Sequence, residues 1–247
     1  MQLIKKKIKY KFDKACASYD SVANVQKKCA ANLIDKLLKY FYRDNISKIL
    51  DVGTGTGYIP ELLIKNYPNS LYDLNDISSN MLVCAKEKLS APCNVILGDM
   101  EDVDFGSYDL ITANFALQWA LNLNKMLIKL YKKSNIFAFS CILSGTFIEW
   151  VNKFENLHLS FPINKYPEGY QLENFLLSLN PKKYFFETKE YPITFNNSLD
   201  FIKYLKKLGA SAIDDSISLS ELKNIIKIND QPFSVSYRVF FGILERS

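Results

Sequence analysis

The segment ISKILDVGTGTG, residues 46–57, decides the fold of this chain. Its first seven residues predict a short β-strand, and a helical pattern follows from Ile59. The three glycines between strand and helix let the backbone turn sharply and approach a ligand without a Cβ clash. A dinucleotide-binding fingerprint would need its third glycine at Tyr58, so a pyrophosphate cradle fits this spacing poorly. The segment therefore predicts a strand–loop–helix unit that binds another small ligand, with a plain tight turn as the alternative.

The same alternation of strands and helices continues on the carboxyl side of this unit. Alternation at this spacing predicts a parallel sheet covered by helices on both faces. Two helices are predicted to precede it, within residues 1–39. The elements predicted in this half are strands at 70–75, 94–97, 108–113 and 136–141, and helices at 59–64, 79–89 and 123–131.

The pattern changes after Cys141. We interpret the second half as completing the same sheet, with a helical cap inserted, so that residues 1–247 form one domain. That domain would comprise amino-terminal helices (1–45), a cofactor-binding half (46–141) and a substrate-side half (142–247). The elements predicted after Cys141 are helices at 147–157, 172–179, 198–208 and 219–228, and strands at 184–188 and 234–244.

Composition limits the functional classes. A hydrophobic fraction of 48% with 23% charged residues is ordinary for a soluble globular protein. No apolar run reaches the roughly 18 residues that a membrane span needs, and no secretory signal follows the basic start. We therefore expect a cytoplasmic protein without a membrane partner, and a monomer. The net charge of +5 is not accompanied by a recognisable nucleic-acid module, so no nucleic-acid partner is expected.

The cysteine and histidine content argues against a metal centre. The five cysteines form no CxxC pair, and His158 is the single histidine, so we expect no metal site. Scattered buried thiols are the expected state of the cysteines. A single histidine also argues against a hydrolase built on a Ser-His or Cys-His pair.

Polar residues at the ends of two further strands are candidate ligand contacts. Asp76 ends the second predicted strand, where a carboxylate can accept hydrogen bonds from both hydroxyls of a ribose. Asp73 is the alternative residue for that role. Asp76 could instead have a purely structural role, as an acidic residue at the start of a helix. Asn114 ends the fourth strand, and ligands of open α/β sheets lie at the carboxyl ends of strands.

Together, these motifs resemble those of class I S-adenosylmethionine-dependent methyltransferases. The glycine-rich loop is similar to motif I, which passes beside the methionine part of the cofactor. The resemblance implies that Asp99 accepts a hydrogen bond from the adenine amine while Met100 packs on the ring. The cofactor-binding residues that it implies are Asp51, Gly53, Thr54, Gly55, Gly57, Asp76, Ile77, Met81, Asp99, Met100 and Asn114.

The flanking segments resemble the malonyl-acyl-carrier-protein O-methyltransferase family, which starts biotin synthesis. The resemblance implies methyl transfer from S-adenosylmethionine to the free carboxylate of malonyl on acyl-carrier protein, or on coenzyme A. The product would be the malonyl methyl ester that primes pimeloyl synthesis. The segments that carry the resemblance are FDKACASYD (12–20), Val25-Gln26, Leu117-Gln118-Trp119, residues 139–146, Leu208-Gly209-Ala210, Tyr237 and residues 240–244.

Residues that align the acceptor are expected around the same site. The carboxylate of malonate is ionised at neutral pH, so the reaction needs no general base and no catalytic residue is assigned. Tyr19 is the candidate for closing the amino-terminal helix over the cofactor, and Arg238 offers a planar fork that suits a carboxylate. Gln118 and Trp119 are candidate wall residues. For each of these, a structural role is the alternative.

Two other functions fit the same motifs. One is a methyltransferase of another carboxylic acid or small molecule, as in the related trans-aconitate methyltransferases. The other is a non-methylating protein similar to complex I assembly factors, which share the core and a similar tail. The chain also departs from the family pattern, because KKSN at 132–135 lacks the usual proline-glycine turn before the fifth strand.

Overall fold

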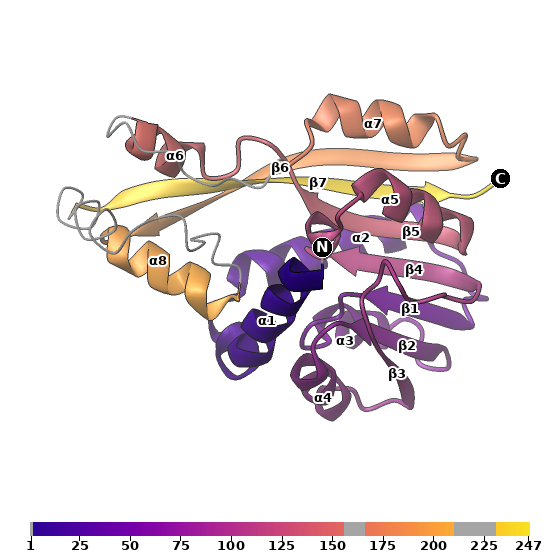
Figure 1. The fold of residues 1–247 in the computed structure, drawn as a ribbon. Helices are drawn as coiled ribbons and strands as arrows, with labels where there is room; N and C mark the ends of the chain where they lie inside the picture. The colour runs from indigo at the N-terminus through magenta and orange to yellow at the C-terminus, as the bar shows by residue number, and fades with distance from the viewer. Residues whose placement is uncertain (1, 156–165, 210–230) are drawn as a thin grey trace.

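The computed structural model describes residues 2–155, 166–209 and 231–247 (Figure 1). The predicted helix at 219–228, the end of the one at 147–157, and His158 lie outside the described residues. None of the helices in the described part of the chain is both long and apolar enough to cross a membrane.

One seven-stranded sheet organises the fold, with strand order β3-β2-β1-β4-β5-β7-β6. β1 to β5 pair in parallel, and β7 runs antiparallel to both of its neighbours. The predicted Rossmann-like, mostly parallel sheet is therefore confirmed. The strands are β1 (Lys48–Val52), β2 (Leu71–Asp76), β3 (Cys93–Leu97), β4 (Tyr108–Asn114), β5 (Ser134–Ile142), β6 (Lys183–Phe195) and β7 (Phe233–Glu245).

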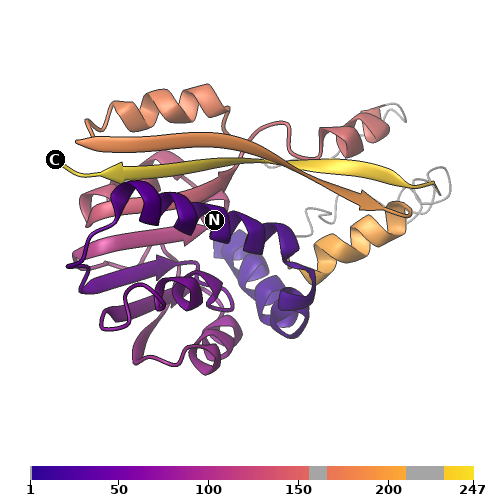
Figure 2. The same ribbon diagram turned by 180° about the vertical axis from the view of Figure 1, so that it is seen from behind.

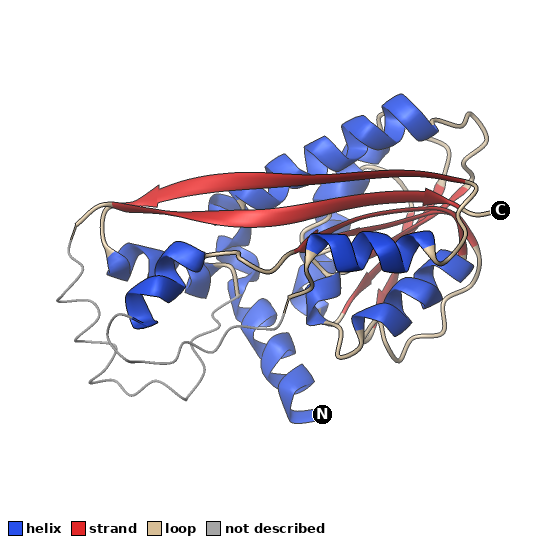
Figure 3. Cartoon of the chain, turned by 90° about the horizontal axis from the view of Figure 1, so that it is seen from above, coloured by secondary structure: helices blue, strands red, loops and turns tan. Residues whose placement is uncertain are grey.

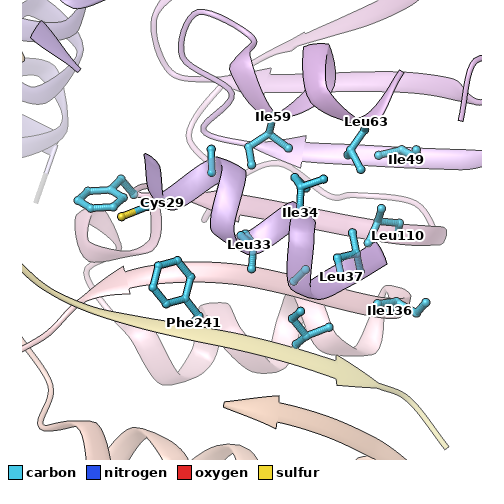
Figure 4. Close-up of a cluster of buried hydrophobic side chains, with 14 of the residues drawn as sticks. Cys29, Leu33, Ile34, Leu37, Ile49, Ile59, Leu63, Leu110, Ile136 and Phe241 are labelled. Carbon is cyan, nitrogen blue, oxygen red and sulfur yellow. The ribbon is translucent and has the colours of Figure 1, made fainter. Parts of the chain in front are cut away.

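Helices cover both faces of this sheet, as Figures 2 and 3 show. Apolar side chains from α2 and α3 pack on one face with Ile49, Leu110 and Ile136 (Figure 4). Side chains from α5 and α7 pack on the other face around Phe137 and Phe139. The helices are α1 (Gln2–Val22), α2 (Asn24–Phe41), α3 (Tyr58–Leu63), α4 (Ser79–Lys88), α5 (Leu123–Lys132), α6 (Ile148–Glu155), α7 (Gly169–Leu177) and α8 (Ser198–Lys207), with a short 3-10 helix η1 (Leu117–Trp119).

The last two strands extend beyond the rest of the sheet as a long two-stranded ribbon (Figure 1). β6 pairs with β7 over its whole length, whereas β5 reaches only as far as Val239. The strand predicted at 184–188 is therefore shorter than the observed β6. In the sequence, Pro192 is a local signal against a strand that continues beyond it. Pro192 is accommodated because β6 is an edge strand, where one side of the backbone needs no partner.

The described part of the helical cap packs on this ribbon. Trp150 of α6 and Phe201 of α8 are fully buried, and they form a small apolar cluster with Val235 of β7. Their rings meet edge-on, with centroids 4.9 Å apart. The ribbon therefore has a hydrophobic core separate from the two that flank the sheet.

Helix α1 lies over the carboxyl ends of the first strands. It contacts α4 and α8, and Asp13 accepts a hydrogen bond of 2.6 Å from Ser78, just after β2. A disulfide joins Cys16 of α1 to Cys84 of α4. The expectation of scattered thiols was therefore wrong for this pair, whose partners are separated by 68 residues and so carry no local signal.

Candidate functional site

The glycine-rich loop after β1 adopts a backbone that favours glycine. Gly53, Gly55 and Gly57 have φ angles of +63°, +55° and +80°, in the left-handed region. A Cβ at Gly53 would lie 2.4 Å from the Cβ of Ala116, whereas one at Gly55 would meet nothing within 4 Å. Gly53 is thus required by close packing against the segment after β4, and Gly55 faces open space.

Asp76 lies beside this loop at the end of β2. Its side chain is only 8% exposed, and it accepts hydrogen bonds from the backbone N–H groups of Gly55, at 2.9 Å, and Ser78, at 2.8 Å. Burial nevertheless raises the pKa of Asp76 to about 6. Each carboxylate oxygen accepts one backbone hydrogen bond and keeps further acceptor capacity for a ligand.

Asp73, the alternative to Asp76, is committed to the fold. Its carboxylate accepts hydrogen bonds from the Tyr108 hydroxyl, at 2.7 Å, and from the Asn94 amide, at 2.9 Å. It does not line either of the two cavities described below. The geometry therefore favours Asp76 for ligand contact.

Two adjoining cavities open at the carboxyl ends of these strands. The larger has an empty volume of about 610 Å³ including its mouth, which is within the range of small-molecule sites. Both cavities are lined by Tyr19, Gly53, Gly55 and Asn114. The other predicted residues on the larger cavity are Asp76, Ile77, Met81, Asp99, Met100 and Trp119, and those on the smaller are Asp51 and Thr54.

Helix α1 supplies one wall of the larger cavity. Lys5 forms ion pairs with Asp99, at 3.0 Å, and Glu101, at 2.6 Å, and donates a hydrogen bond to the backbone carbonyl of Trp119. The ring of Phe12 meets that of Trp119 edge-on, with centroids 5.5 Å apart. Sequence reasoning did not assign Lys5 or Phe12 to the cavity, because no signal distinguishes Lys5 from the other lysines of this helix.

A second contact holds the carboxyl end of α1 to the glycine-rich loop. Asp20 accepts hydrogen bonds from the Thr56 hydroxyl, at 2.8 Å, and from the Lys88 ammonium, at 2.7 Å. These contacts keep the pKa of Asp20 below its usual value, although partial burial acts in the opposite direction. The helix is therefore anchored at both ends of the cavity that it covers.

The segment after β4 is held in a constrained turn. The side chain of Asn114 accepts a hydrogen bond from Ser140, at 2.6 Å, and donates one to the backbone carbonyl of Gln26, at 3.1 Å. Phe115 has a φ of +53°, and its carbonyl accepts a hydrogen bond from Gln118. Gln118 thus supports the turn and lines neither cavity.

Arg238 lies apart from the cavities. Its guanidinium donates to the carbonyl of Ser144, at 3.0 Å, and its Nε is 3.4 Å from a carboxylate oxygen of Glu190. The preceding residue, Tyr237, points to the opposite face of β7, where its ring contacts Phe115. The structure does not bring Arg238 together with the other predicted site residues, and Gly57 lines neither cavity.

Asp51 is the second buried carboxyl group of the site. It is 2% exposed and accepts a hydrogen bond of 2.6 Å from Thr112, yet burial raises its pKa to about 7. In the unfolded chain such a group ionises near pH 4. Folding therefore opposes its ionisation between these two pH values.

Replacing Asp51 with Asn is expected to change how stability depends on pH. The pKa of Asp51 is higher in the native state than in the unfolded chain, so its protonated form stabilises the native state at pH values below the pKa of the unfolded chain. This contribution is lost as pH rises through about 7. From pH 4 to 7, the unfolding free energy of the wild type should fall by at least ~1 kcal/mol relative to the variant. Urea unfolding across this range measures the difference, and parallel curves for the two proteins would contradict the prediction.

Comparison with known proteins places this geometry in a family. A methyltransferase-domain family model matches residues 49–133. The YcgJ protein from Bacillus subtilis has a similar fold, with a TM-score of 0.60 at 16% identity, covering 88% of this chain and 99% of that one. The plantazolicin methyltransferase BpumL, solved with a desmethylPZN analog and SAH, has a TM-score of 0.56 at 15% identity, covering 100% of this chain and 97% of its own.

Curated relatives extend the match along the whole chain. The malonyl-acyl-carrier-protein O-methyltransferase of Neorickettsia risticii is 32% identical over 96% of this chain and 94% of its own length. The protein of the same name from Buchnera aphidicola is 30% identical over 97% of this chain and 98% of its own length. This chain therefore belongs to the malonyl-acyl-carrier-protein O-methyltransferase family.

Proposed function

We propose that this protein transfers a methyl group from S-adenosylmethionine to the free carboxylate of malonyl-acyl-carrier protein. The product is the malonyl methyl ester that primes pimeloyl and biotin synthesis. The observation that carries this proposal is the end-to-end similarity to relatives of that name. The glycine-rich loop, with a buried acid beside it at the strand ends, supports the cofactor part of this proposal independently.

The residues around the larger cavity fit S-adenosylmethionine. Gly53 and Gly55 line the cavity and would leave the backbone open for the methionine part, and a Cβ at Gly55 would meet no protein atom within 4 Å. The Asp76 carboxylate accepts the ribose hydroxyl hydrogens in addition to its two backbone hydrogen bonds. Asp99 and Met100 line the same cavity, where Asp99 would accept a hydrogen bond from the adenine amine and Met100 would supply an apolar surface for the ring.

The chain's main tasks are alignment and exclusion of water. When bound, S-adenosylmethionine supplies an electrophilic methyl group on a sulfonium. The acceptor carboxylate is already ionised at neutral pH, so no side chain has to remove a proton. Ile8 and Phe12 of α1, with Trp119, form an apolar wall over the cavity. A water-poor site favours a step in which opposite charges neutralise, and orientation of the two substrates supplies much of the rate.

The test is methyl transfer from labelled S-adenosylmethionine to malonyl-acyl-carrier protein, with malonyl-coenzyme A and acetyl-acyl-carrier protein alongside. We expect label on malonyl thioesters and none on the acetyl thioester, since only malonyl offers a free carboxylate. The ratio of kcat/KM for the two malonyl substrates gives the carrier preference. Binding of the cofactor without any transfer to either malonyl substrate would refute the proposed reaction.

Replacing Arg238 with Met tests the interpretation of its position. Because the guanidinium contacts Ser144 and Glu190, and lines neither cavity, the KM for the malonyl thioester should change by less than about threefold. Loss of the hydrogen bond to Ser144 should cost about 1 kcal/mol of stability. Steady-state kinetics and urea unfolding measure the two effects. A rise in KM of tenfold or more would contradict this prediction and would indicate that Arg238 binds the acceptor carboxylate.

A further inference from the structure

Three tyrosines and a glutamine gather next to the glycine-rich loop. We call Tyr19, Gln26, Tyr204 and Tyr237 the tyrosine cluster. The hydroxyls of Tyr204 and Tyr237 are 3.4 Å apart, and the side-chain amide of Gln26 interacts with both and lowers their pKa values. Tyr19 interacts electrostatically with Tyr204. These residues come from α1, α2, α8 and β7, so only the folded chain brings them together.

The tyrosine cluster borders the reaction site. Tyr19 lines both cavities, and Gln26 lines the smaller one beside Gly53 and Asn114, whereas Tyr204 and Tyr237 line neither and adjoin the site through Gln26. The ring of Tyr237 contacts that of Phe115, in the turn after β4, with centroids 5.8 Å apart. The cluster therefore lies at the carboxyl ends of β1 and β4, where an acceptor must meet the cofactor's methyl group.

Gln26 and Tyr237 of this cluster are buried, and one of their polar atoms has no hydrogen-bond partner among the described residues. Gln26 is 7% exposed and Tyr237 is 2% exposed. The Oε1 atom of Gln26 accepts no hydrogen bond from the described residues, which is unusual for a buried amide. Burial also raises the pKa values of all three tyrosines, so their hydroxyls remain protonated donors at neutral pH.

We propose that the tyrosine cluster binds the carboxylate of the acceptor. Tyr19 and the Tyr204–Tyr237 pair supply O–H donors. Rotation of the Gln26 amide by 180° would let Oε1 accept from one tyrosine of this pair while Nε2 donates into the site, and the O–H of the other tyrosine stays available to the carboxylate. The inference rests on the proposed function and adds the residues that select a substrate with a free carboxylate.

Neutral donors suit this reaction better than a cation. The carboxylate loses its charge as the methyl group arrives, so an ion pair with arginine would stabilise the ground state more than the transition state. Such an ion pair would lower KM without raising kcat. Hydroxyl donors orient the attacking oxygen and retain part of their interaction with the ester, so they keep the acceptor aligned and lower its nucleophilicity less than a full positive charge would.

The experiment removes single hydroxyls while keeping the rings. Tyr237→Phe and Tyr204→Phe are each assayed for kcat and KM with malonyl-acyl-carrier protein, and for S-adenosylmethionine affinity by calorimetry. We expect kcat/KM to fall by about 10–100-fold, because hydrogen bonds to a charged group are the stronger kind. Cofactor affinity should stay within about twofold. Acetyl-acyl-carrier protein, as a competitive inhibitor, should bind wild type and variants equally.

Tyr72→Phe is the matched control, since its buried hydroxyl donates only to the backbone carbonyl of Tyr67 at 2.9 Å, away from the cavities. Its kcat/KM should equal that of the wild type.

Unchanged kcat/KM in both cluster variants would overturn the inference. A loss of cofactor affinity equal to the loss of kcat/KM would also overturn it, because the cluster would then bind S-adenosylmethionine. A wild type that methylates no malonyl thioester would refute the proposed function, and the inference with it. Tyr204→Phe, at a less buried position, keeps the test valid if Tyr237→Phe does not fold.

Discussion

Replacing Asp76 with Ala is expected to weaken S-adenosylmethionine binding by about 100-fold or more. The wild-type carboxylate is positioned by the N–H groups of Gly55 and Ser78, so it is oriented before the ligand arrives. Loss of two charge-assisted hydrogen bonds corresponds to ~3 kcal/mol or more, which is about two orders of magnitude in Kd. Calorimetric titration with S-adenosylmethionine and S-adenosylhomocysteine measures the loss, which should be similar for both because they share the ribose.

Folding stability should be affected much less than affinity. The variant loses the acceptor for two backbone N–H groups, but it also loses a buried carboxyl group whose pKa burial raises to about 6. These two effects oppose each other at neutral pH. Thermal unfolding of the ligand-free variant therefore tests whether weak binding reflects the site or a damaged fold.

Asp73→Asn provides the matched control on the same strand. Its oxygen still accepts the Tyr108 hydroxyl, and the residue lines neither cavity, so cofactor affinity should stay within about threefold of the wild type. Equal losses in the two variants would show that β2 as a whole, and not the Asp76 carboxylate, supports binding. Unchanged affinity in Asp76→Ala would remove the ribose assignment.

Much of the sheet could be predicted from the sequence because local patterns determine it. Alternating apolar strands and helices gave the order and type of the elements from 46 to 141 with small errors at their ends. The glycine-rich loop marked the ligand side, because its position between strand and helix requires an unusual backbone. Asp76 and Asn114 followed from the rule that ligands meet the carboxyl ends of strands.

The remaining features depend on contacts between residues distant in sequence. The length of β6 is determined by its pairing with β7, which overrides the local signal of Pro192. The ion pairs of Lys5 with Asp99 and Glu101 join residues more than 90 positions apart, and no pattern in the sequence selects one lysine over its neighbours. The direction of Arg238 depends on the register of β7, which sequence alternation alone could not determine.

Replacing Gly53 with Ala is expected to lower the free energy of unfolding by about 2–5 kcal/mol. A φ of +63° disfavours any residue with a Cβ, at a cost of ~1–2 kcal/mol. The new Cβ would also lie 2.4 Å from that of Ala116, and relief of such a clash in a packed region costs about 1–3 kcal/mol. Gly55→Ala is the contrast, since its Cβ would meet nothing within 4 Å, and only the first cost applies.

The two costs at Gly53 can be separated because the clash has a single principal partner. In Gly53→Ala with Ala116→Gly, the nearest remaining atom would be the Ala116 Cα at 3.6 Å, an ordinary contact. The double variant should therefore be more stable than the sum of the single effects predicts, by about 1–3 kcal/mol in a double-mutant cycle by urea unfolding. Additive effects would mean that the loop moves away from the turn after β4 without cost. That result would remove the packing argument for Gly53 and leave its backbone angle as the sole reason for glycine.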